Sequence, residues 1–291
     1  MIRIENLKVK YSNKTVLNID TPLRFNSNDR IGIIGSNGAG KSTMVNALLD
    51  LIPYEGRYDL GVAKEDIGVH MQFNEYQDAV SIKTIIEMVL NCKIERNKKL
   101  KELIEFFDFE QSLKKKFSQL SGGQKQRLTL ILVLAKDSKM VFFDEVTSGL
   151  DFQTRERLMD LLSKWYEDKD TGIIIISHYY QELENIINKL IILDDGEIVD
   201  WGDVKELFQK YCGHSLFIVE SEKIEEFNSF DTKKREGKKF IIRPRNHREE
   251  EEILKKLYQL DADYRRTKRD IEILTEIALE EKKRRKNDYA E

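Results

Sequence analysis

The sequence predicts an α/β protein with a mostly parallel sheet, extended by a smaller α+β domain at its C-terminal end. A glycine-rich segment at residues 35–43 lies between an apolar run and a helical pattern, as in a strand, a turn and a helix. Two runs at 140–143 and 173–176 are apolar throughout, which is typical of strands buried on both faces of a parallel sheet. From residue 213 onward the composition changes while apolar periodicity persists, and this predicts the second domain.

The composition is that of a globular protein with a well-solvated surface. Of the 291 residues, 40% are hydrophobic and 35% are charged, and the net charge of -3 gives no general attraction to nucleic acid. No nucleic-acid partner is therefore expected. Cys92 and Cys212 lack the spacing of a disulfide framework or a zinc site, so we interpret them as reduced thiols. No apolar run is long enough to cross a bilayer, and we expect a soluble, intracellular chain.

Residues 35–43 match the phosphate-loop pattern G-x-x-x-x-G-K-[ST], with an apolar run before them and a helical pattern after them. Glycines let the backbone wrap a phosphate chain, with N–H groups and the positive helix end directed at the anion. Lys41 is placed to reach the β- and γ-phosphates, and Ser42 is placed to bind Mg²⁺. The alternative is a glycine-rich surface turn, but all required positions and both flanks are present. The segment predicts a nucleoside triphosphate site.

Several strands are predicted around this loop. Residues 2–11 alternate between apolar and polar, as an antiparallel strand does, and 16–19 and 30–34 read as further strands. Residues 190–200 predict a hairpin with an Asp-Gly turn. Tyr11 closes the first strand, where it could stack on a nucleotide base or simply cover the edge of the core, and both interpretations stay open.

The middle of the chain is predicted to be helical. A turn at 53–56 and a short strand at 67–72 precede it. Between 82 and 117, apolar residues recur at spacings of three and four, which is typical of helices that bury one face. A loop at 120–127 then leads into a predicted helix at 128–135, and this arrangement again offers backbone N–H groups to an anion.

Polar residues follow the two buried strands where ligands of parallel sheets bind. Asp144 and Glu145 end the first strand; Asp144 suits Mg²⁺ coordination, and Glu145 suits a base that deprotonates water. A solvated Asp-Glu turn is the less favoured alternative. His178 follows the second strand, and we weigh a functional role for it above a purely structural one. The turn at 148–151 is expected to cap a helix that begins near Phe152.

Taken in order, these motifs resemble the nucleotide-binding subunit of ATP-binding-cassette (ABC) transporters over residues 1–208. The resemblance places the Walker A loop at 35–43, the Q-loop glutamine at Gln72, the signature LSGGQ at 120–124 and the D-loop at 148–151. It implies ATP and Mg²⁺ as cofactors and the following residue roles. Catalysis falls to Glu145, His178 and Gln72; Mg²⁺ ligation to Ser42, Gln72 and Asp144; and nucleotide contact to Tyr11, Asn37, Gly38, Ala39, Gly40, Lys41, Ser42, Thr43, Ser121, Gly122, Gly123, Gln124 and Asp151.

The resemblance also implies the architecture and the partners. It implies an ATPase domain at 1–212 with an antiparallel β subdomain and an α-helical subdomain at about 73–135, followed by a charged α+β accessory domain at 213–291. Two copies would face head to tail, as a homodimer or within a heterodimer, so that each signature loop meets the partner's nucleotide. A separate transmembrane permease would hold the subunit at the cytoplasmic face of the membrane, as a peripheral protein.

The stretch between Gln72 and Ser121 is short for the family. In this short length the chain resembles the ATPases of type-2 exporters of drugs, peptides or bacteriocins. We therefore expect ATP hydrolysis that drives export of peptides or antibiotics. Val146 departs from the family's usual proline, which puts only local rigidity in doubt. A soluble cassette ATPase acting on ribosomes or DNA is the alternative, but the chain has neither a second cassette nor a long coiled coil. A regulatory nucleotide binder would lack Glu145.

The C-terminal segment is rich in charge but keeps its periodic apolar runs. Residues 216–219 and 240–242 read as strands, and 253–258 read as helical, so an ordered β-α-β type of domain is expected rather than disorder. Residues 264–279 resemble a terminal strand and helix. The basic run at 282–286 reads as a solvated tail, with contact to anionic lipid or to the permease as the alternative.

Overall fold

The computed structural model describes residues 1–70 and 78–288 of the chain. These divide into two compact units, Met1–Ile198 and Val199–Glu291, and each is described by itself. The domain boundary expected at residues 212–213 stays a prediction. No helix in the described part of the chain is long and apolar enough to span a membrane.

An antiparallel sheet opens the first unit, built around β1 (Ile2–Tyr11). β1 pairs with β2 (Lys14–Ile19), β3 (Leu23–Phe25) and β5 (Glu55–Asp59). β1 buries Ile2 and Ile4 in alternation and then, beyond an irregularity of its pairing with β5 between Ile4 and Asn6, Leu7 and Val9. β3 and β5 were not predicted, because both are short and polar residues interrupt them.

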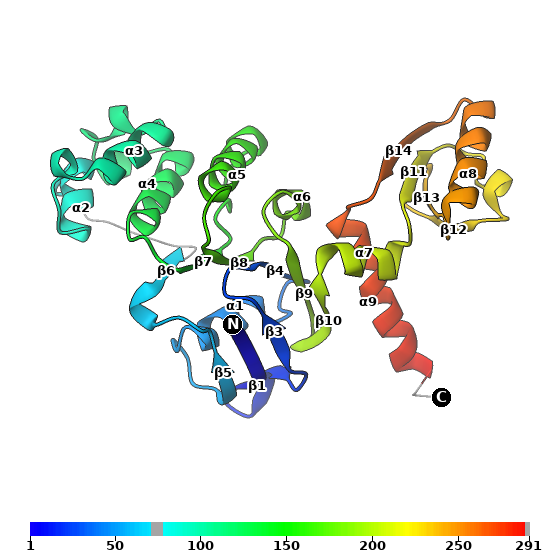
Figure 1. Ribbon diagram of the computed structural model, residues 1–291, viewed down its shortest axis with the longest axis horizontal. Helices are drawn as coiled ribbons and strands as arrows, with labels where there is room; N and C mark the ends of the chain where they lie inside the picture. Colours follow the sequence, from blue (N-terminus) through cyan, green and yellow to red (C-terminus); the bar gives the residue numbers. More distant parts are fainter. Residues whose placement is uncertain (71–77, 289–291) are drawn as a thin grey trace. The chain divides into compact units, whose positions relative to one another are not determined.

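The second sheet has the strand order β10-β9-β4-β8-β7-β6 (Figure 1). Its members are β4 (Arg30–Gly35), β6 (Ile67–His70), β7 (Met140–Asp144), β8 (Gly172–Ile176), β9 (Lys189–Asp194) and β10 (Glu197–Asp203). The pairs β4–β8, β4–β9, β7–β8 and β6–β7 are parallel. β7 and β8 are buried along their whole length, which explains their unbroken apolar sequences.

The helices of the first unit are α1 (Lys41–Leu48), α2 (Ile82–Val89), α3 (Lys98–Phe106), α4 (Gly122–Leu134), α5 (Phe152–Tyr166) and α6 (Tyr180–Glu184). Single 3₁₀ turns lie at η1 (Lys64–Asp66), η2 (Ile94–Arg96), η3 (Glu110–Ser112) and η4 (Phe117–Gln119). Figure 1 shows α2, α3 and α4 gathered in one helical group. The predicted helical segment is thus broken where Asn91 and Asp108 take positive φ angles of 48° and 50°.

The second unit begins within β10 and continues with α7 (Val204–Cys212) and a four-stranded antiparallel sheet. The sheet order is β12-β13-β11-β14, with β11 (Leu216–Glu220), β12 (Asp231–Lys234), β13 (Lys239–Arg243) and β14 (Asp263–Thr267). α8 (His247–Gln259) buries Ile253 and Leu257 against Phe217, Phe240 and Ile242 of the sheet, together with Phe227 of η5 (Ile224–Phe227). The ordered α+β fold expected here is confirmed.

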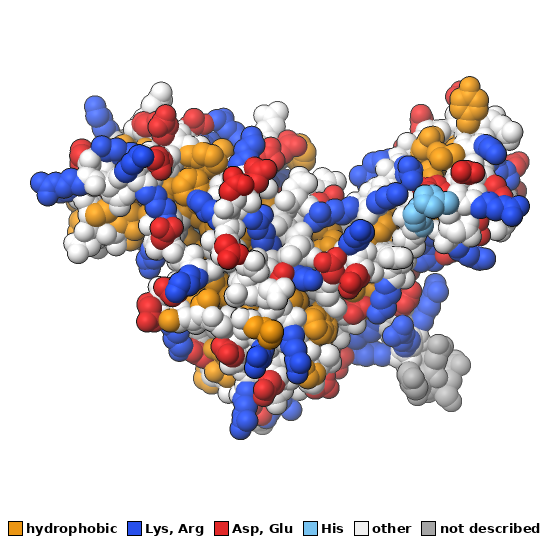
Figure 2. Space-filling view, viewed as in Figure 1, with side chains coloured by type: hydrophobic (Ala, Val, Ile, Leu, Met, Phe, Trp, Pro, Cys, Tyr) orange, Lys and Arg blue, Asp and Glu red, His pale blue; other side chains and the backbone are white. Residues whose placement is uncertain are grey.

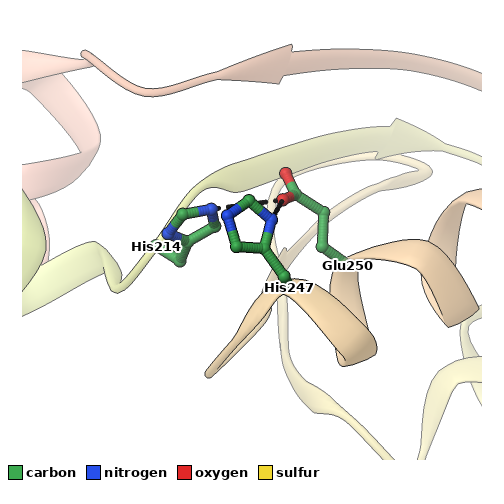
Figure 3. A group of neighbouring side chains, drawn as sticks. All are labelled: His214, His247 and Glu250. Atoms are coloured by element: carbon green, nitrogen blue, oxygen red, sulfur yellow. Dashed lines mark ion pairs between the residues drawn. The ribbon is translucent and has the colours of Figure 1, made fainter.

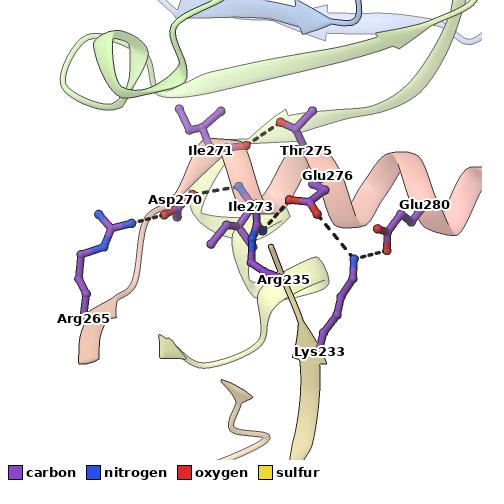
Figure 4. Close-up of polar contacts among 9 residues, drawn as sticks. All are labelled: Lys233, Arg235, Arg265, Asp270, Ile271, Ile273, Thr275, Glu276 and Glu280. Atoms are coloured by element: carbon purple, nitrogen blue, oxygen red, sulfur yellow. Dashed lines mark hydrogen bonds and ion pairs between the residues drawn. The ribbon is translucent and has the colours of Figure 1, made fainter. Parts of the chain in front are cut away.

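Ion pairs connect the last helix, α9 (Ile271–Asp288), to the strand segment before β13 (Figure 4). Lys233 contacts Glu280 and Glu276, and Arg235 contacts Glu276 at 2.5 Å. Asp270 accepts a hydrogen bond from the backbone N–H of Ile273 at 2.9 Å and so caps the helix. Because oppositely charged side chains pair in this way, the high charge of this unit is compatible with an ordered fold.

Candidate nucleotide-binding site

Three adjacent parallel strands, β4, β8 and β7, carry the predicted functional residues at their C-terminal ends. Ile33 of β4 is the Cα partner of Ile176, and Ile176 is the Cα partner of Asp144, so the three strands end in one row. The phosphate loop follows the first strand, Ser177-His178 follows the second, and Asp144-Glu145 ends the third. All three segments therefore lie at the same edge of the sheet.

The phosphate loop is held tightly at its base and is open at its middle. A Cβ atom at Gly35, whose φ angle is 153°, would lie 2.1 Å from the carbonyl oxygen of Leu193, so only glycine fits there. Ala39 is buried, and its carbonyl accepts a hydrogen bond from the Gly196 N–H at 3.1 Å. Asn37 and Gly38 are exposed. The exposed middle of the loop is accessible to a ligand, as phosphate binding requires.

Gly40 ends the loop and begins α1. Its φ angle of 99° lies in the left-handed region, and no side chain caps the helix there. The helix N-terminus therefore keeps uncapped N–H groups next to the loop, with Ser42 exposed and Thr43 half-buried. Such a terminus favours an anion.

Lys41 is folded into the loop. Its Nζ donates hydrogen bonds to the carbonyl oxygens of Gly35 and Ser36 at 2.9 and 3.0 Å, and the residue is only 6% exposed. Burial lowers the pKa of Lys41, while the neighbouring carboxylates of Glu145 and Asp144 act in the opposite direction. The ammonium group is thus held by weakly competing carbonyl groups where a phosphate could replace them.

A hydroxyl and a carboxylate approach each other beside this lysine. Ser42 Oγ lies 3.4 Å from Asp144 Oδ1, and Asp144 is 8% exposed. Burial raises the pKa of Asp144, and the negative charge of Glu145 acts in the same direction. Excess negative charge among hard oxygen donors is the environment that suits Mg²⁺, so Ser42 and Asp144 fit the expected cation.

Glu145 and His178 form an ion pair across the strand ends. His178 Nε2 lies 2.8 Å from Glu145 Oε1, and the side chains are 37% and 19% exposed. Glu145 takes a φ angle of 49°, which is uncommon outside glycine, while its N–H donates to the Ile176 carbonyl at 3.1 Å. The strained backbone and the paired imidazole fix one orientation of this carboxylate.

A second carboxylate, Glu182 of α6, connects the segments on either side of that pair. It accepts hydrogen bonds from Thr147 Oγ1 at 2.9 Å and Ser177 Oγ at 2.9 Å, and it lies 3.4 Å from Arg155 Nε. Burial raises the pKa of Glu182, and these hydrogen bonds and Arg155 oppose the rise. Arg155 also lies over the ring of Tyr179 at 3.6 Å.

Sequence reasoning missed this network. Thr147 and Ser177 directly flank the functional positions in sequence, but nothing in their spacing points to a shared partner on α6. The sequence offered one signal for this network, which is that both residues are polar and follow buried strands. Two hydroxyls in such places each need a hydrogen-bond partner once they are buried.

The signature residues lie at the N-terminus of α4, in the helical group. Ser121 Oγ accepts a hydrogen bond from the Gln124 N–H at 3.3 Å, and Gln124 Oε1 accepts from the Ser121 N–H at 3.1 Å, which forms a capping box. The helix therefore begins at Gly122, and the expected start at Leu128 is wrong because the glycines were read as loop. A Cβ atom at Gly123 would lie 2.7 Å from Thr154 Cγ2.

The described structure does not join the signature residues to the phosphate loop. Among the described residues, Ser121 and Gln124 form hydrogen bonds with each other, with Lys115 and with Lys125, all within the helical part of the chain. Ser121 and Gly122 are exposed. The exposed N-terminus of α4 can therefore meet an anion that is not bound in this phosphate loop.

The remaining predicted residues have other surroundings. Asp151 caps α5, accepting from the Thr154 N–H at 3.0 Å and from its hydroxyl at 2.7 Å, and these hydrogen bonds lower the pKa of Asp151. Tyr11 is 49% exposed at the end of β1, so stacking on a base stays a prediction. Gln72 lies outside the described residues. Val146, in the place of the expected proline, is buried at 2% exposure.

Known proteins that are similar to this chain identify its family. A family model described as ABC transporter matches residues 20–148. Among curated relatives, methionine import ATP-binding protein MetN 1 of Oceanobacillus iheyensis is 31% identical over 233 residues, covering 72% of this chain and 68% of the relative. MetN of Lactobacillus delbrueckii subsp. bulgaricus is 27% identical over 257 residues, covering 76% and 73%.

Solved structures agree on the fold. An ATP-binding subunit of an ABC transporter superposes with a TM-score of 0.64 at 18% identity, covering 73% of this chain and 93% of that one. The cbiO1 protein of Clostridium perfringens, described as part of an ABC transporter complex, superposes with a TM-score of 0.62 at 24% identity, covering 72% and 90%. The predicted cassette fold is confirmed.

These comparisons overturn one expectation. The curated relatives are import ATP-binding proteins, so the expected likeness to type-2 exporter ATPases, and with it the export of peptides or antibiotics, is wrong. That expectation depended on the length between Gln72 and Ser121. Segment length in the helical part does not determine the direction of transport, because neither ATP chemistry nor the membrane pathway depends on it.

Proposed function

Because this chain belongs to the ABC transporter family as an ATP-binding subunit, we propose that it powers a membrane importer through ATP binding and hydrolysis. The observation that carries the proposal is the convergence of the phosphate loop, Asp144 and the Glu145–His178 pair at one sheet edge. Each group there has a distinct role in phosphoryl transfer to water.

Glu145 serves as the base for the attacking water. His178 Nε2 lies 2.8 Å from Glu145 Oε1, and this contact fixes the orientation of the carboxylate that accepts the proton of the water. His178 therefore orients the base. Lys41 leaves its two carbonyl partners to hold the β- and γ-phosphates, and the open middle of the loop supplies backbone N–H groups.

Ser42 and Asp144 hold Mg²⁺ together with the nucleotide, and Gln72 completes the set in this proposal. The ion supplies charge neutralisation at the β- and γ-phosphate oxygens when it is bound. A cation bound beside Asp144 would favour its ionised form and so oppose the burial that raises its pKa.

The active form is a head-to-tail dimer. Ser121 and Gly122 are exposed at the N-terminus of α4, next to the buried Gly123, so this helix end reaches the γ-phosphate of the nucleotide on a second copy. Both half-sites of a homodimer are then complete, and ATP joins the two copies until it is hydrolysed. The catalytic residues of this chain show no substitution that would call for a heterodimer.

The import substrate and the membrane partner are proposed from the relatives. Methionine, or an amino acid similar to it, is the proposed substrate, because the named relatives at 27–33% identity are methionine import proteins. A separate permease supplies the membrane pathway, and the subunit binds at the cytoplasmic face through the helical group.

The test combines one variant with three measurements, namely ATP hydrolysis, ATP-induced dimerisation and uptake into vesicles. We expect Glu145→Gln to slow ATP hydrolysis by about 10²–10⁴-fold, because it removes the base, while ATP binding persists. ATP should then hold the variant as a stable dimer in size-exclusion chromatography. In vesicles that also contain the permease, ATP should drive labelled methionine inward for the wild type and not for the variant.

Glu156→Gln, which changes an exposed carboxylate on α5, is the matched control and should leave all three measurements unchanged. Near-normal hydrolysis by Glu145→Gln would contradict the assignment of the base. ATP-driven movement outward would contradict import, while inward movement of a different amino acid would contradict only the proposed substrate.

A further inference from the structure

Two of the four histidines of the chain meet one buried carboxylate in the C-terminal unit (Figure 3). His214 precedes β11, and His247 and Glu250 lie on the first turn of α8, three residues apart on one helix face. Their nearest ligand atoms all lie within 4.8 Å of one another. None of the three belongs to the ATP site.

Two of the three separations between the ligand atoms match those of a metal site. His214 Nε2 lies 3.3 Å from Glu250 Oε2, and His247 Nδ1 lies 3.4 Å from the same oxygen. Tetrahedral ligands about 2.1 Å from a zinc ion are separated by roughly 3.3 Å. Only the separation of the two nitrogens must shorten, and His247, whose side chain is 76% exposed, is free to rotate.

Glu250 is held by its other oxygen. Oε1 accepts hydrogen bonds from Ser215 Oγ at 2.7 Å and Arg266 Nε at 2.6 Å, and the residue is 3% exposed. These two hydrogen bonds fix the position of Oε1. Ser215 and Arg266 thus orient the carboxylate in the way that outer partners orient metal ligands, with Oε2 directed at both imidazoles.

An ordinary ion pair does not account for His214. Its Nε2 is buried, lies 3.3 Å from Glu250 Oε2, and still makes no hydrogen bond of acceptable geometry within residues 1–70 and 78–288. The imidazole rings of His214 and His247 lie with their centroids 4.0 Å apart. A buried nitrogen without a partner is costly, and a cation between the three groups would remove that cost.

We propose that His214, His247 and Glu250 bind a divalent transition-metal ion of the Zn²⁺ type. Two imidazoles and one carboxylate are the donors that such an ion prefers, whereas Mg²⁺ prefers oxygen alone. Cys212 lies nearby in sequence, but it is fully buried and does not belong to this group of neighbouring ligand atoms.

The surroundings predict a reversible site rather than a structural one. Histidine atoms reach the surface of this unit in Figure 2, so the ion has access and a water molecule completes its coordination. The positive charge of Arg266 and the N-terminal end of α8 weaken cation binding. Metal binding joins the segment before β11 to α8, so we expect it to stabilise this unit in proportion to metal concentration.

The probe is Co²⁺, which reports on its ligands by absorption, titrated into the full chain without nucleotide and with excess Mg²⁺. We expect one equivalent to give visible d–d bands, Zn²⁺ to displace it, and Zn²⁺ to raise the melting temperature of the wild type. His247→Ala should weaken binding at least about tenfold, because loss of a direct ligand costs no less than loss of an outer one.

His247 is exposed, so its removal leaves the fold intact, and His214→Ala gives a second test that spares Glu250 and its partners. Glu251→Gln removes an exposed carboxylate from the same helix turn and should bind as the wild type does. Absence of stoichiometric binding, or wild-type affinity in both histidine variants, would overturn the site. ATP hydrolysis is a separate readout, so failure here leaves the proposed function standing.

Discussion

His70 shows how a single buried residue makes stability depend on pH. It ends β6 with no exposed surface, and its Nε2 lies 3.1 Å from Gln126 Oε1, while Nδ1 has no hydrogen-bond partner within the described residues. Burial lowers the pKa of His70 to about 4, with the Gln126 contact opposing the change. The neutral imidazole is therefore the form that the fold accepts.

This leads to a prediction for acid stability. The unfolded chain takes up a proton at His70 near pH 6.5 and the folded chain only near pH 4, so folding stability falls as the pH drops through that window. Between pH 7 and pH 5 the loss from this residue is about 2 kcal/mol. In urea denaturation, His70→Gln should show a pH dependence that is flatter by that amount. Parallel curves for the variant and the wild type would rule out this role.

Single residues also show that a local motif does not reveal contacts between segments far apart in the sequence. Glu145 and His178 were both singled out in sequence, yet their 2.8 Å contact joins the ends of two strands that are neighbours only in the folded sheet. Glu182 escaped notice because its two hydroxyl partners come from different strand ends. Pairings of this kind depend on strand order, which periodicity does not encode.

At the scale of elements, α4 combines a structural and a proposed functional role in one residue. Ser121 caps the helix through its side-chain oxygen, and the same helix end is the proposed contact with the partner's nucleotide. Substitutions can separate the two roles, because some side chains keep the cap and lose the contact.

We predict that Ser121→Ala lowers the free energy of unfolding by about 1 kcal/mol through loss of the cap. Ser121→Asp keeps a capping oxygen and should retain stability, but its negative charge repels the γ-phosphate and should abolish ATP-induced dimerisation. Thermal denaturation and size-exclusion chromatography of both variants measure the two effects. Normal dimerisation of Ser121→Asp would mean that the signature end does not meet the nucleotide.

At the scale of the whole molecule, the helical group presents apolar surface. Met88 and Val89, at the end of α2, are 70% and 49% exposed, and Figure 2 shows hydrophobic side chains on the surface of this helical group. An exposed apolar patch in a region that also carries the signature helix is well placed to receive a permease segment.

We predict that Met88→Glu leaves ATP hydrolysis by the isolated subunit unchanged and reduces ATP-driven uptake at least about tenfold, because a charge replaces an apolar contact. Co-purification with the permease measures the loss of binding directly. Tyr258→Glu, which changes an 88% exposed residue of α8, is the matched control. Equal loss of uptake in both variants would show a general effect of added charge rather than a docking surface.

Much of the first unit follows from local patterns. The apolar strands, the phosphate loop and the alternation of β1 were predictable, because burial on one or both faces leaves a period in the sequence. The sequence did not predict the short strands β3 and β5 or the early start of α4. Turn-like residues form β3 and β5 because they pair with β1, and turn-like residues begin α4 because a capping box stabilises them.

The sequence by itself determined the identity of this protein's chemistry, because each phosphate-binding and catalytic motif is a short segment whose residue types are dictated by the ligand. Only the tertiary structure decided which residues meet. It paired Glu145 with His178, placed Glu182 between two strand ends, and brought His214 to His247 and Glu250. The physical reason is that these contacts depend on the order of strands and on the packing of a helix on a sheet, and both are set by burial summed over the whole chain.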